Sequence, residues 1–190
     1  MHLHRAIIPT PLGNMLALAS QEGLCALEFD GPLTGGAGLS GRRDGGAESP
    51  VLHARLRRWF PPHDLVDTDM PTLRRTREWL AAYFDGASAD TGDMPLDLRG
   101  APFELRVWAR LRSIRPGETS TYGAIAKELA APGASRAVGA ANGANPVGII
   151  VPCHRVIGSS GTLTGYGGGL ERKEWLLKHE ARWRGQAVLF

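Results

Sequence analysis

The chain has 190 residues, of which 43% are hydrophobic and 22% charged, a composition typical of a globular protein and not of a disordered one. It has no apolar run as long as a membrane span needs, and its opening residues lack the pattern of a signal peptide. The two cysteines, Cys25 and Cys153, are too few for a disulfide framework or a cysteine-rich zinc module. We therefore expect free thiols, no metal, no membrane contact and a cytoplasmic location.

The net charge of +3 is distributed unevenly along the chain. Residues 101–190 contain twelve Lys and Arg against six Asp and Glu, a balance of +6, which leaves ten basic and thirteen acidic residues, a balance of −3, in residues 1–100. A basic half suits contact with a polyanion, but an ordinary solvated surface explains the bias more simply. Charge alone therefore does not indicate nucleic-acid binding.

The first part of the chain predicts short strands followed by a loop. Apolar runs over residues 5–9, 15–19 and 25–29 are separated by turn residues and predict three strands. Residues 31–50 contain seven glycines without a period. This segment predicts a flexible loop, and we assign no function to it.

Two helices and a linker are expected after this loop. Residues 50–60 predict a basic helix, or the end of a helix, that stops at a Pro-Pro pair. Residues 71–84 predict a second helix, because apolar residues recur at three- and four-residue spacing after a proline suited to a first helical turn. The polar residues 85–100 predict a linker, so we expect two domains, residues 1–95 and 96–190.

The second half predicts a mostly helical domain. Helical patterns cover residues 102–114, 121–130 and 170–180, and Ser135 is expected to be the N-cap of a further helix that runs to about Gly143. This helix and the one before it are joined by a tight Gly-containing turn, which is typical of a helix-turn-helix. Together the two halves predict the α/β (α+β) fold class.

Cys153 follows a short apolar segment and has His154 beside it, so it is a candidate nucleophile. A thiol has a pKa of about 8.5 unless its surroundings change it, so a base is needed for attack at neutral pH. His154 can be that base, and Glu174, in the last predicted helix, is the candidate that orients it. A lone Cys-His pair is nevertheless more often a buried small side chain beside a core histidine.

The residues around this pair extend the pattern. Pro152-Cys153-His154-Arg155-Val156 resembles the active-site signature of the O6-alkylguanine-DNA alkyltransferases, also called methylated-DNA–protein-cysteine methyltransferases. Further motifs occur in the order and spacing of that family: Ser135-Arg136-Ala137-Val138-Gly139, Asn145-Pro146, Gly165-Tyr166-Gly167-Gly168-Gly169 and Lys173-Glu174-Trp175-Leu176-Leu177. The resemblance is strong over residues 102–180 and fainter over residues 5–30. Several coupled motifs are far more specific than one short match.

The resemblance implies repair of double-stranded DNA by direct reversal. An alkyl group on O6 of a flipped-out guanine would move irreversibly to Cys153, in a single turnover and without a cofactor. Glu174, His154 and a water would remove the thiol proton, and Tyr122 would donate a hydrogen bond to the guanine. Asn145 would brace the segment before the nucleophile.

A base pocket is implied by the same resemblance. Its members are Pro152, Val156, Tyr166 and Gly167. The backbone N–H of Gly167 would face O6 of the guanine, and the backbone carbonyls of Cys153 and Val156 would accept from its exocyclic amine.

The resemblance also implies that the second helix of the helix-turn-helix enters the minor groove, where small side chains permit close approach. Arg136 would take the place that the flipped nucleotide leaves. The residues expected at the DNA are Tyr122, Ser135, Arg136, Ala137, Gly139, Ala140, Asn142 and Gly143. Asn142 stands where some members carry an apolar residue beside the flipped base.

The family's N-terminal domain is ribonuclease-H-like, so the resemblance implies that arrangement for residues 1–95. We expect no structural zinc, because Cys25 and the scattered His2, His4 and His53 do not form a ligand set. We expect a monomer. The sequence leaves open whether O4-alkylthymine is a substrate, which alkyl groups are accepted and whether molecules bind DNA cooperatively.

Two other functions remain as alternatives at this point. A cysteine hydrolase would use Cys153, His154 and Glu174 and turn over on esters or amides, but it gives no reason for a helix-turn-helix. A non-catalytic DNA-binding protein would keep its whole function after Cys153→Ala. DNA repair predicts that the same variant binds DNA and transfers nothing.

Overall fold

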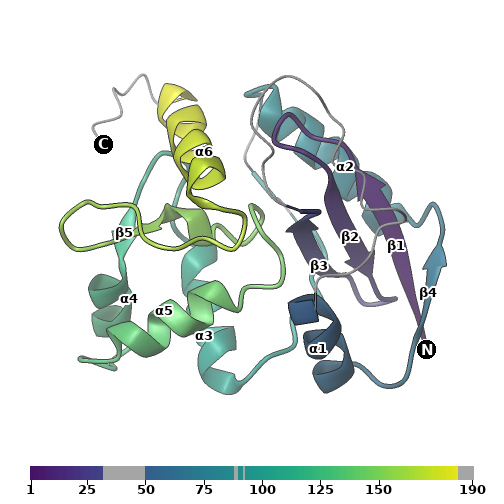
Figure 1. Ribbon diagram of the computed structural model, residues 1–190, viewed down its shortest axis with the longest axis horizontal. Helices are drawn as coiled ribbons and strands as arrows, with labels where there is room; N and C mark the ends of the chain where they lie inside the picture. Colours follow the sequence, from purple (N-terminus) through teal and green to yellow (C-terminus); the bar gives the residue numbers. More distant parts are fainter. Residues whose placement is uncertain (32–49, 88–89, 92, 184–190) are drawn as a thin grey trace. The chain divides into compact units, whose positions relative to one another are not determined.

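The computed structural model describes residues 1–31, 50–87, 90–91 and 93–183 (Figure 1). The chain forms two compact units, Met1–Arg99 and Gly100–Phe190, and helices and strands occur in both. The loop expected at residues 31–50 lies, apart from its two end residues, outside the described part. No helix in the described part is long and apolar enough to cross a membrane.

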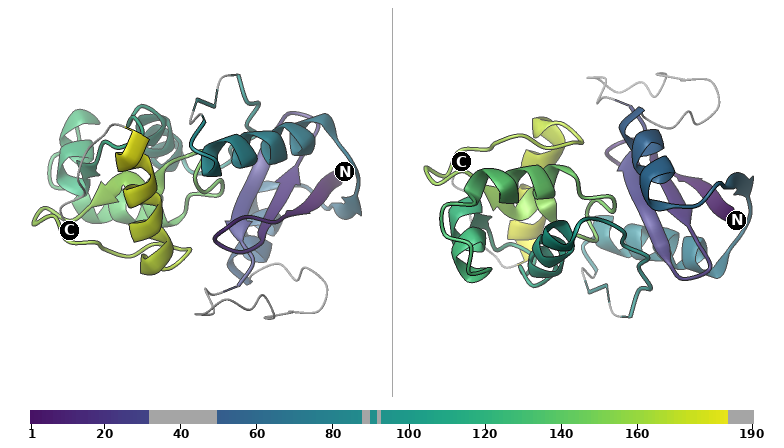
Figure 2. Two further views of the ribbon diagram at one scale, coloured as in Figure 1. Left: turned by 90° about the horizontal axis from the view of Figure 1, so that it is seen from above. Right: turned by 90° about the horizontal axis from the view of Figure 1, so that it is seen from below.

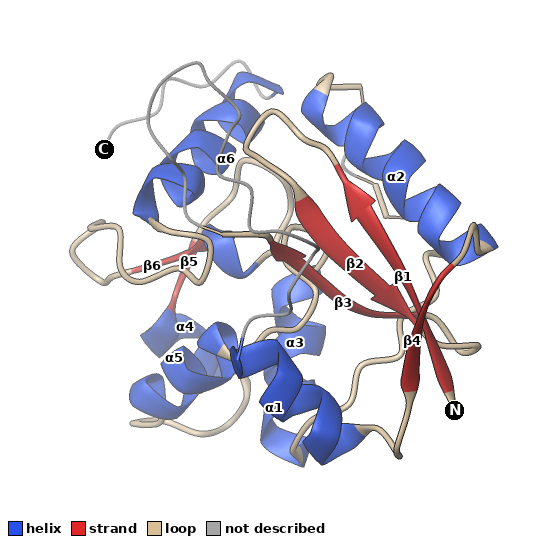
Figure 3. Cartoon of the chain, turned by 45° about the vertical axis from the view of Figure 1, so that its right-hand side comes forward, coloured by secondary structure: helices blue, strands red, loops and turns tan. Residues whose placement is uncertain are grey.

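A four-stranded sheet with the order β3-β2-β1-β4 is the centre of the first unit (Figures 1 and 3). β1 (His2–Ile8), β2 (Met15–Ala19) and β3 (Leu24–Phe29) are antiparallel neighbours, which confirms the three predicted strands with small shifts at their ends. β4 (Asp64–Asp67) pairs in parallel with β1, and the sequence analysis missed it. Two apolar residues between two acidic ones are too few to identify a strand by its period.

Two helices cover opposite faces of this sheet, as both views of Figure 2 show. α1 (Pro50–Trp59) shares a buried cluster with Leu16 and Leu18 of β2, and α2 (Pro71–Phe84) packs on β1 and β2. Both helices confirm the prediction. Because alternate residues of a strand point to opposite faces, a strand covered on both faces is apolar throughout, and all five residues of β2 are buried.

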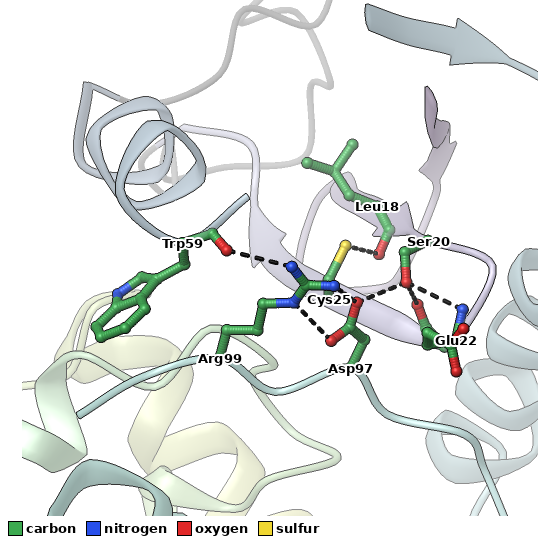
Figure 4. A network of polar contacts seen from close by, with 8 residues as sticks. Leu18, Ser20, Glu22, Cys25, Trp59, Asp97 and Arg99 are labelled. Carbon is green, nitrogen blue, oxygen red and sulfur yellow. Dashed lines mark hydrogen bonds and ion pairs between the residues drawn. The ribbon is translucent and has the colours of Figure 1, made fainter. Parts of the chain in front are cut away.

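A polar network attaches the end of the linker to the first unit (Figure 4). Asp97 accepts a hydrogen bond of 2.6 Å from Ser20 Oγ and a bidentate pair, 2.9 and 3.0 Å, from Arg99. Backbone hydrogen bonds add to these contacts: Leu24 N–H donates to the carbonyl of Pro95, and Asp97 N–H donates to the carbonyl of Leu24. The division between the units lies at residues 99/100, four residues after the expected position. The backbone of Pro95 and Asp97 is hydrogen-bonded to Leu24 of β3, and Arg99 is paired with Asp97, so this end of the linker belongs to the first unit.

Four α-helices and a two-stranded sheet occur in the described part of the second unit (Figures 1 and 3). The helices are α3 (Pro102–Arg112), α4 (Tyr122–Glu128), α5 (Ser135–Gly143) and α6 (Leu170–Trp183). All four confirm predicted helices, and α6 continues three residues beyond the predicted end at residue 180. The chain, with helices and strands in both units, therefore has a mixed α/β fold, as predicted.

The starts of α4 and α5 differ in how they are capped. Thr121 is the N-cap of α4, where its hydroxyl accepts from Ala124 N–H at 3.1 Å. The prediction that Ser135 caps α5 is wrong, because Ala134 occupies that position without a side-chain hydrogen bond. Ser135 lies inside the helix with its hydroxyl toward α4, 3.6 Å from the position of a Cβ on Gly123.

β5 (Ser120–Thr121) and β6 (Val156–Ile157) pair in parallel (Figure 3). This pairing brings the start of α4 beside the segment that follows Cys153. It therefore joins two parts of the sequence that both carry predicted site residues.

Candidate active site

Cys153 begins a short 3-10 helix, η1 (Cys153–Arg155), after a constrained apolar segment. Within that segment the buried Ile149 has a φ of 67°, a left-handed conformation that costs free energy for a β-branched residue. Asn145 holds the segment in place, because its Nδ2 donates to the carbonyl of Val151 at 2.7 Å and its Oδ1 accepts from Val147 N–H at 3.1 Å. Asn145, which was expected to brace this segment, thus contacts Val147 near its start and Val151 near its end.

The Cys153 thiol is buried, and burial raises its pKa because the thiolate loses solvation. A hydrogen bond from Asn145, the charge of Lys173 and the N–H groups of Cys153 and His154 act in the opposite direction. The thiol is therefore protonated at neutral pH, and it needs a base at the moment of attack. The groups that would stabilise the thiolate are already arranged around it.

His154 is fully buried, and only one of its ring nitrogens has a partner among the described residues. Nε2 lies 3.0 Å from Glu180 Oε1, whereas Nδ1 has no hydrogen-bond partner there. A carboxylate only accepts, so the proton of the neutral ring belongs on Nε2 and the lone pair on Nδ1. Burial lowers the pKa of His154, against the effect of Glu180, so the ring is neutral and able to take a proton.

The carboxylate that contacts His154 is Glu180 and not the predicted Glu174. Glu174 is a partly exposed residue that pairs with Lys178 one turn further along α6. Six residues at 100° each place Glu174 and Glu180 about 120° apart around the helix. The period of the buried α6 residues points to Glu180, which lies seven positions after the buried Lys173 and so on the same face.

Glu180 is completely buried and satisfied by four hydrogen bonds. Arg155 donates to both of its oxygens, at 2.8 Å from Nε and 2.7 Å from Nη2, and Gly117 N–H donates at 3.1 Å. Burial alone would raise the pKa of Glu180, but His154 and Arg155 outweigh it and hold the pKa well below its usual range. The sequence analysis assigned no role to Arg155, which neutralises this carboxylate.

Lys173 is a second buried cation without an assigned role. Its side chain is 0% exposed, and Nζ donates to the carbonyls of Val156 at 2.6 Å and Thr164 at 2.9 Å. Burial lowers the pKa of Lys173 to about 8, against the effect of Cys153. Lys173 therefore connects two parts of the chain close to Cys153.

The two carbonyls expected to bind the exocyclic amine of the base already accept hydrogen bonds within the protein. The carbonyl of Val156 accepts from Lys173. The carbonyl of Cys153 accepts from Val156 N–H and from Asn142 Nδ2, the latter at 3.3 Å. A carbonyl oxygen has two lone pairs, so the carbonyl of Cys153 has its full complement of partners.

Tyr122 lies at the first position of α4, directly after β5. Its hydroxyl is 2.9 Å from Thr164 Oγ1, and its ring lies 3.7 Å from the position of a Cβ on Gly139 of α5. Tyr166 makes an edge contact with His154, with ring centroids 6.4 Å apart, and burial raises its pKa well above the ordinary value. A Cβ on Gly167 would meet no atom within 4 Å.

α5 has one exposed face of small side chains and one buried face. Arg136, Ala137, Ala140 and Gly143 are exposed, and Ser135 and Gly139 are half-buried. Asn142 was expected at the DNA, but it is only 4% exposed, and it belongs to the buried face with Val138 and Ala141. Its amide donates to the carbonyl of Cys153, so its contact is with the backbone of that residue.

Cys25, the other thiol, lies in β3 of the first unit. It is 3% exposed and donates to the carbonyl of Leu18 at 3.2 Å (Figure 4). Burial raises the pKa of Cys25 to about 12, with a further contribution from Asp97. Its thiolate is therefore negligible at neutral pH, and Cys25 is chemically inert there.

Comparison with known proteins gives matches in both units. Residues 102–182 match the family model described as "6-O-methylguanine DNA methyltransferase, DNA binding domain". The chain is 34% identical over 178 residues to the methylated-DNA–protein-cysteine methyltransferase of Haemophilus influenzae. This match covers 94% of this chain and 86% of that relative. The chain is 60% identical over 105 residues to the methylated-DNA–protein-cysteine methyltransferase of Mycolicibacterium paratuberculosis. That match covers 55% of this chain and 63% of the relative.

The fold is also similar to a solved structure. The crystal structure of Mycobacterium tuberculosis OGT in complex with DNA matches with a TM-score of 0.72 at 36% identity, over 96% of this chain and 94% of that chain. Several curated relatives match over a shorter stretch, and the chain spans only 59% to 63% of their length.

Proposed function

Because the chain belongs to the methylated-DNA–protein-cysteine methyltransferase family, we propose that it repairs alkylated double-stranded DNA by direct reversal. In this reaction Cys153 takes the alkyl group from O6 of a guanine and keeps it. A thioether sulfur is a poor leaving group, so each molecule reacts once. No cofactor takes part.

One observation carries the assignment of the chemistry. His154, next to the buried thiol of Cys153, is itself 0% exposed, with Nε2 held by Glu180 and Nδ1 without a partner among the described residues. A histidine that served only to fill the core would have both nitrogens satisfied. The unpartnered Nδ1 supports a base that takes the thiol proton through an intervening water.

The bonds change in one displacement. The sulfur–carbon bond forms as the carbon–O6 bond breaks, and the electron pair of the broken bond leaves with the guanine. The thiol proton passes to His154 and is returned through solvent to the guanine, so the products are neutral guanine and a neutral thioether. Tyr122 donates a hydrogen bond to the departing base and lowers the cost of its developing negative charge.

α4 and α5 form, in this proposal, a helix-turn-helix that contacts the minor groove. The exposed face of α5 supports it, because Ala137, Ala140 and Gly143 leave room for close approach of a backbone. The exposed Arg136 would fill the space that the flipped nucleotide leaves. Asn142, on the buried face, has no part in this contact.

For the first unit we propose the ribonuclease-H-like arrangement. The strand order β3-β2-β1-β4, with three antiparallel strands and β4 parallel to β1, supports it. We assign no chemistry to this unit, and its free thiol Cys25 is inert.

Mass spectrometry tests the proposal directly. The protein is incubated with duplex DNA that carries one O6-methylguanine, digested, and its two cysteine peptides are compared. We expect a single methyl group on the Cys153 peptide, a stoichiometric plateau and an unmodified Cys25 peptide. DNA binding without methylation of Cys153 would instead indicate a lesion-binding protein without alkyl transfer.

A further inference from the structure

Thr164 is the hydrogen-bond partner of the Tyr122 hydroxyl. The two oxygens are 2.9 Å apart and partly buried, although 42 residues separate them in the sequence. Thr164 belongs to the loop between β6 and α6 and has no place in the functional assignments above. Its contact with a residue that acts on the departing base needs an explanation.

The position of Thr164 is determined by groups beside the nucleophile. Its carbonyl accepts from Lys173 Nζ at 2.9 Å, and the same Nζ donates to the carbonyl of Val156 at 2.6 Å. The Lys173 side chain is fully buried, and its contact with the carbonyl of Val156 is shielded from water. At the start of the loop, Gly158 N–H donates to the carbonyl of Thr162 at 2.9 Å.

The position of Tyr122 is determined from the other side. Thr121, directly before it, pairs with Ile157 in the β5–β6 ladder and caps α4 through its side chain. The ring of Tyr122 lies close to Gly139 of α5. The short distance between the Tyr122 and Thr164 hydroxyls thus results from two separately held backbones, and not from two flexible side chains.

Each hydroxyl has one proton to donate and can also accept. When Tyr122 donates its proton to a guanine, it can keep its bond to Thr164 only by accepting, so Thr164 becomes the donor. Two hydrogen bonds in series polarise each other, and the Tyr122 hydroxyl becomes a stronger donor. A valine in place of Thr164 would keep the shape of the side chain and remove the hydroxyl that donates.

We propose that Thr164 is a positioning residue that orients the Tyr122 hydroxyl toward the departing guanine and strengthens its hydrogen bond by donating to it. This inference rests on the proposed function. It predicts that the hydroxyl of residue 164 matters only when residue 122 has a hydroxyl.

A double-mutant cycle tests this dependence. Thr164→Val, Thr164→Ser, Tyr122→Phe and the double variant Tyr122→Phe/Thr164→Val are compared for their rate of methyl transfer and their affinity for duplex DNA. Loss of one hydrogen bond corresponds to roughly a three- to tenfold slower transfer for Thr164→Val. Thr164→Ser should stay close to the unaltered protein, and Thr164→Val should slow Tyr122→Phe no further.

Thr162→Val is the matched control, because Thr162 is an exposed residue of the same loop whose hydroxyl contacts Ser160. It should leave the rate unchanged. A full effect of Thr164→Val in the Tyr122→Phe background, or no effect in the unaltered protein, would overturn the inference. No transfer by the unaltered protein would overturn the proposed function and this inference with it.

Discussion

Glu180 determines which nitrogen of His154 is available as a base. It accepts from Nε2, is neutralised by the bidentate Arg155, and has no exposed surface. A carboxylate in this position orients the ring without drawing a proton away from it. The negative charge matters as much as the hydrogen bond, because the ring becomes positive when it takes the thiol proton.

We expect Glu180→Gln to slow methyl transfer to DNA by roughly 100-fold, the scale of one general base. Glutamine can still accept from His154, but it cannot stabilise the imidazolium or balance the buried Arg155. Single-turnover kinetics with an O6-methylguanine duplex would measure the rate. The control is Glu174→Gln, a partly exposed ion-pair residue whose replacement should change the rate by no more than about twofold. Equal losses in both variants would contradict the assignment of Glu180.

The same residues predict how stability depends on pH. Burial lowers the pKa of His154 below its ordinary 6.5, so below about pH 6.5 the unfolded chain takes up a proton that the folded protein does not. The pKa of Glu180 is held below its ordinary 4.5, so a second such proton follows below about pH 4.5. The free energy of unfolding should therefore fall in two stages on acidification. Urea titrations from pH 7.5 to pH 3.5 measure it, and Glu180→Gln should flatten the lower stage.

α5 separates two tasks onto two faces of one short helix. Its buried face carries Asn142, which donates to the carbonyl of Cys153, and its exposed face carries the small side chains. A nine-residue helix rotates through only two and a half turns, so each task is confined to a few positions. The helix therefore connects the proposed DNA contact directly with the backbone of the nucleophile.

Ala140→Leu tests the exposed face of α5. The added atoms reach into solvent in the free protein, so thermal stability should not change. In a closely packed complex they would cause overpacking and weaken binding to duplex DNA by roughly tenfold or more. Fluorescence anisotropy measures the affinity. Ala81→Leu, at an exposed position of α2, is the matched control, and unchanged binding by Ala140→Leu would refute the proposed contact.

At the scale of the whole molecule, each unit has its own polar anchor. In the first unit Asp97 joins Ser20, Arg99 and the backbone of β3, and in the second Glu180 joins Arg155, His154 and Gly117. The thiol near the first anchor, Cys25, is buried and protonated at neutral pH. We therefore assign it to stability alone.

Asp97→Ala should lower the free energy of unfolding by about 2 kcal/mol, because it removes charge-assisted hydrogen bonds from a side chain that is only 10% exposed. The rate of methyl transfer by the folded protein should not change. Asp67→Ala is the control, since Asp67 also pairs with an arginine but is 72% exposed, so its loss should change the free energy of unfolding much less. Chemical denaturation measures both, and equal losses would contradict the role of the network.

Local patterns were sufficient to predict much of this protein. The helices α2 and α3 follow from the period of their apolar residues, and β1 to β3 from short apolar runs between turns. Cys153, the proposed nucleophile, and His154 are adjacent in the chain, so one motif identifies them together. Each of these features depends on residues a few positions apart.

Tertiary contacts decided what local patterns left open. Glu180 and not Glu174 reaches His154, because the rotation of α6 against η1 selects one of two carboxylates. The end of the linker belongs to the first unit because the backbone of Pro95 and Asp97 is hydrogen-bonded to Leu24 of β3, which a polar composition does not indicate. Asn142 faces the nucleophile instead of the outside, and Thr164 meets Tyr122 across 42 residues. The sequence alone determined which chemical groups are present and which helices carry them. The packing of those helices determined which groups meet, because burial and hydrogen bonding select among partners that are distant in the chain.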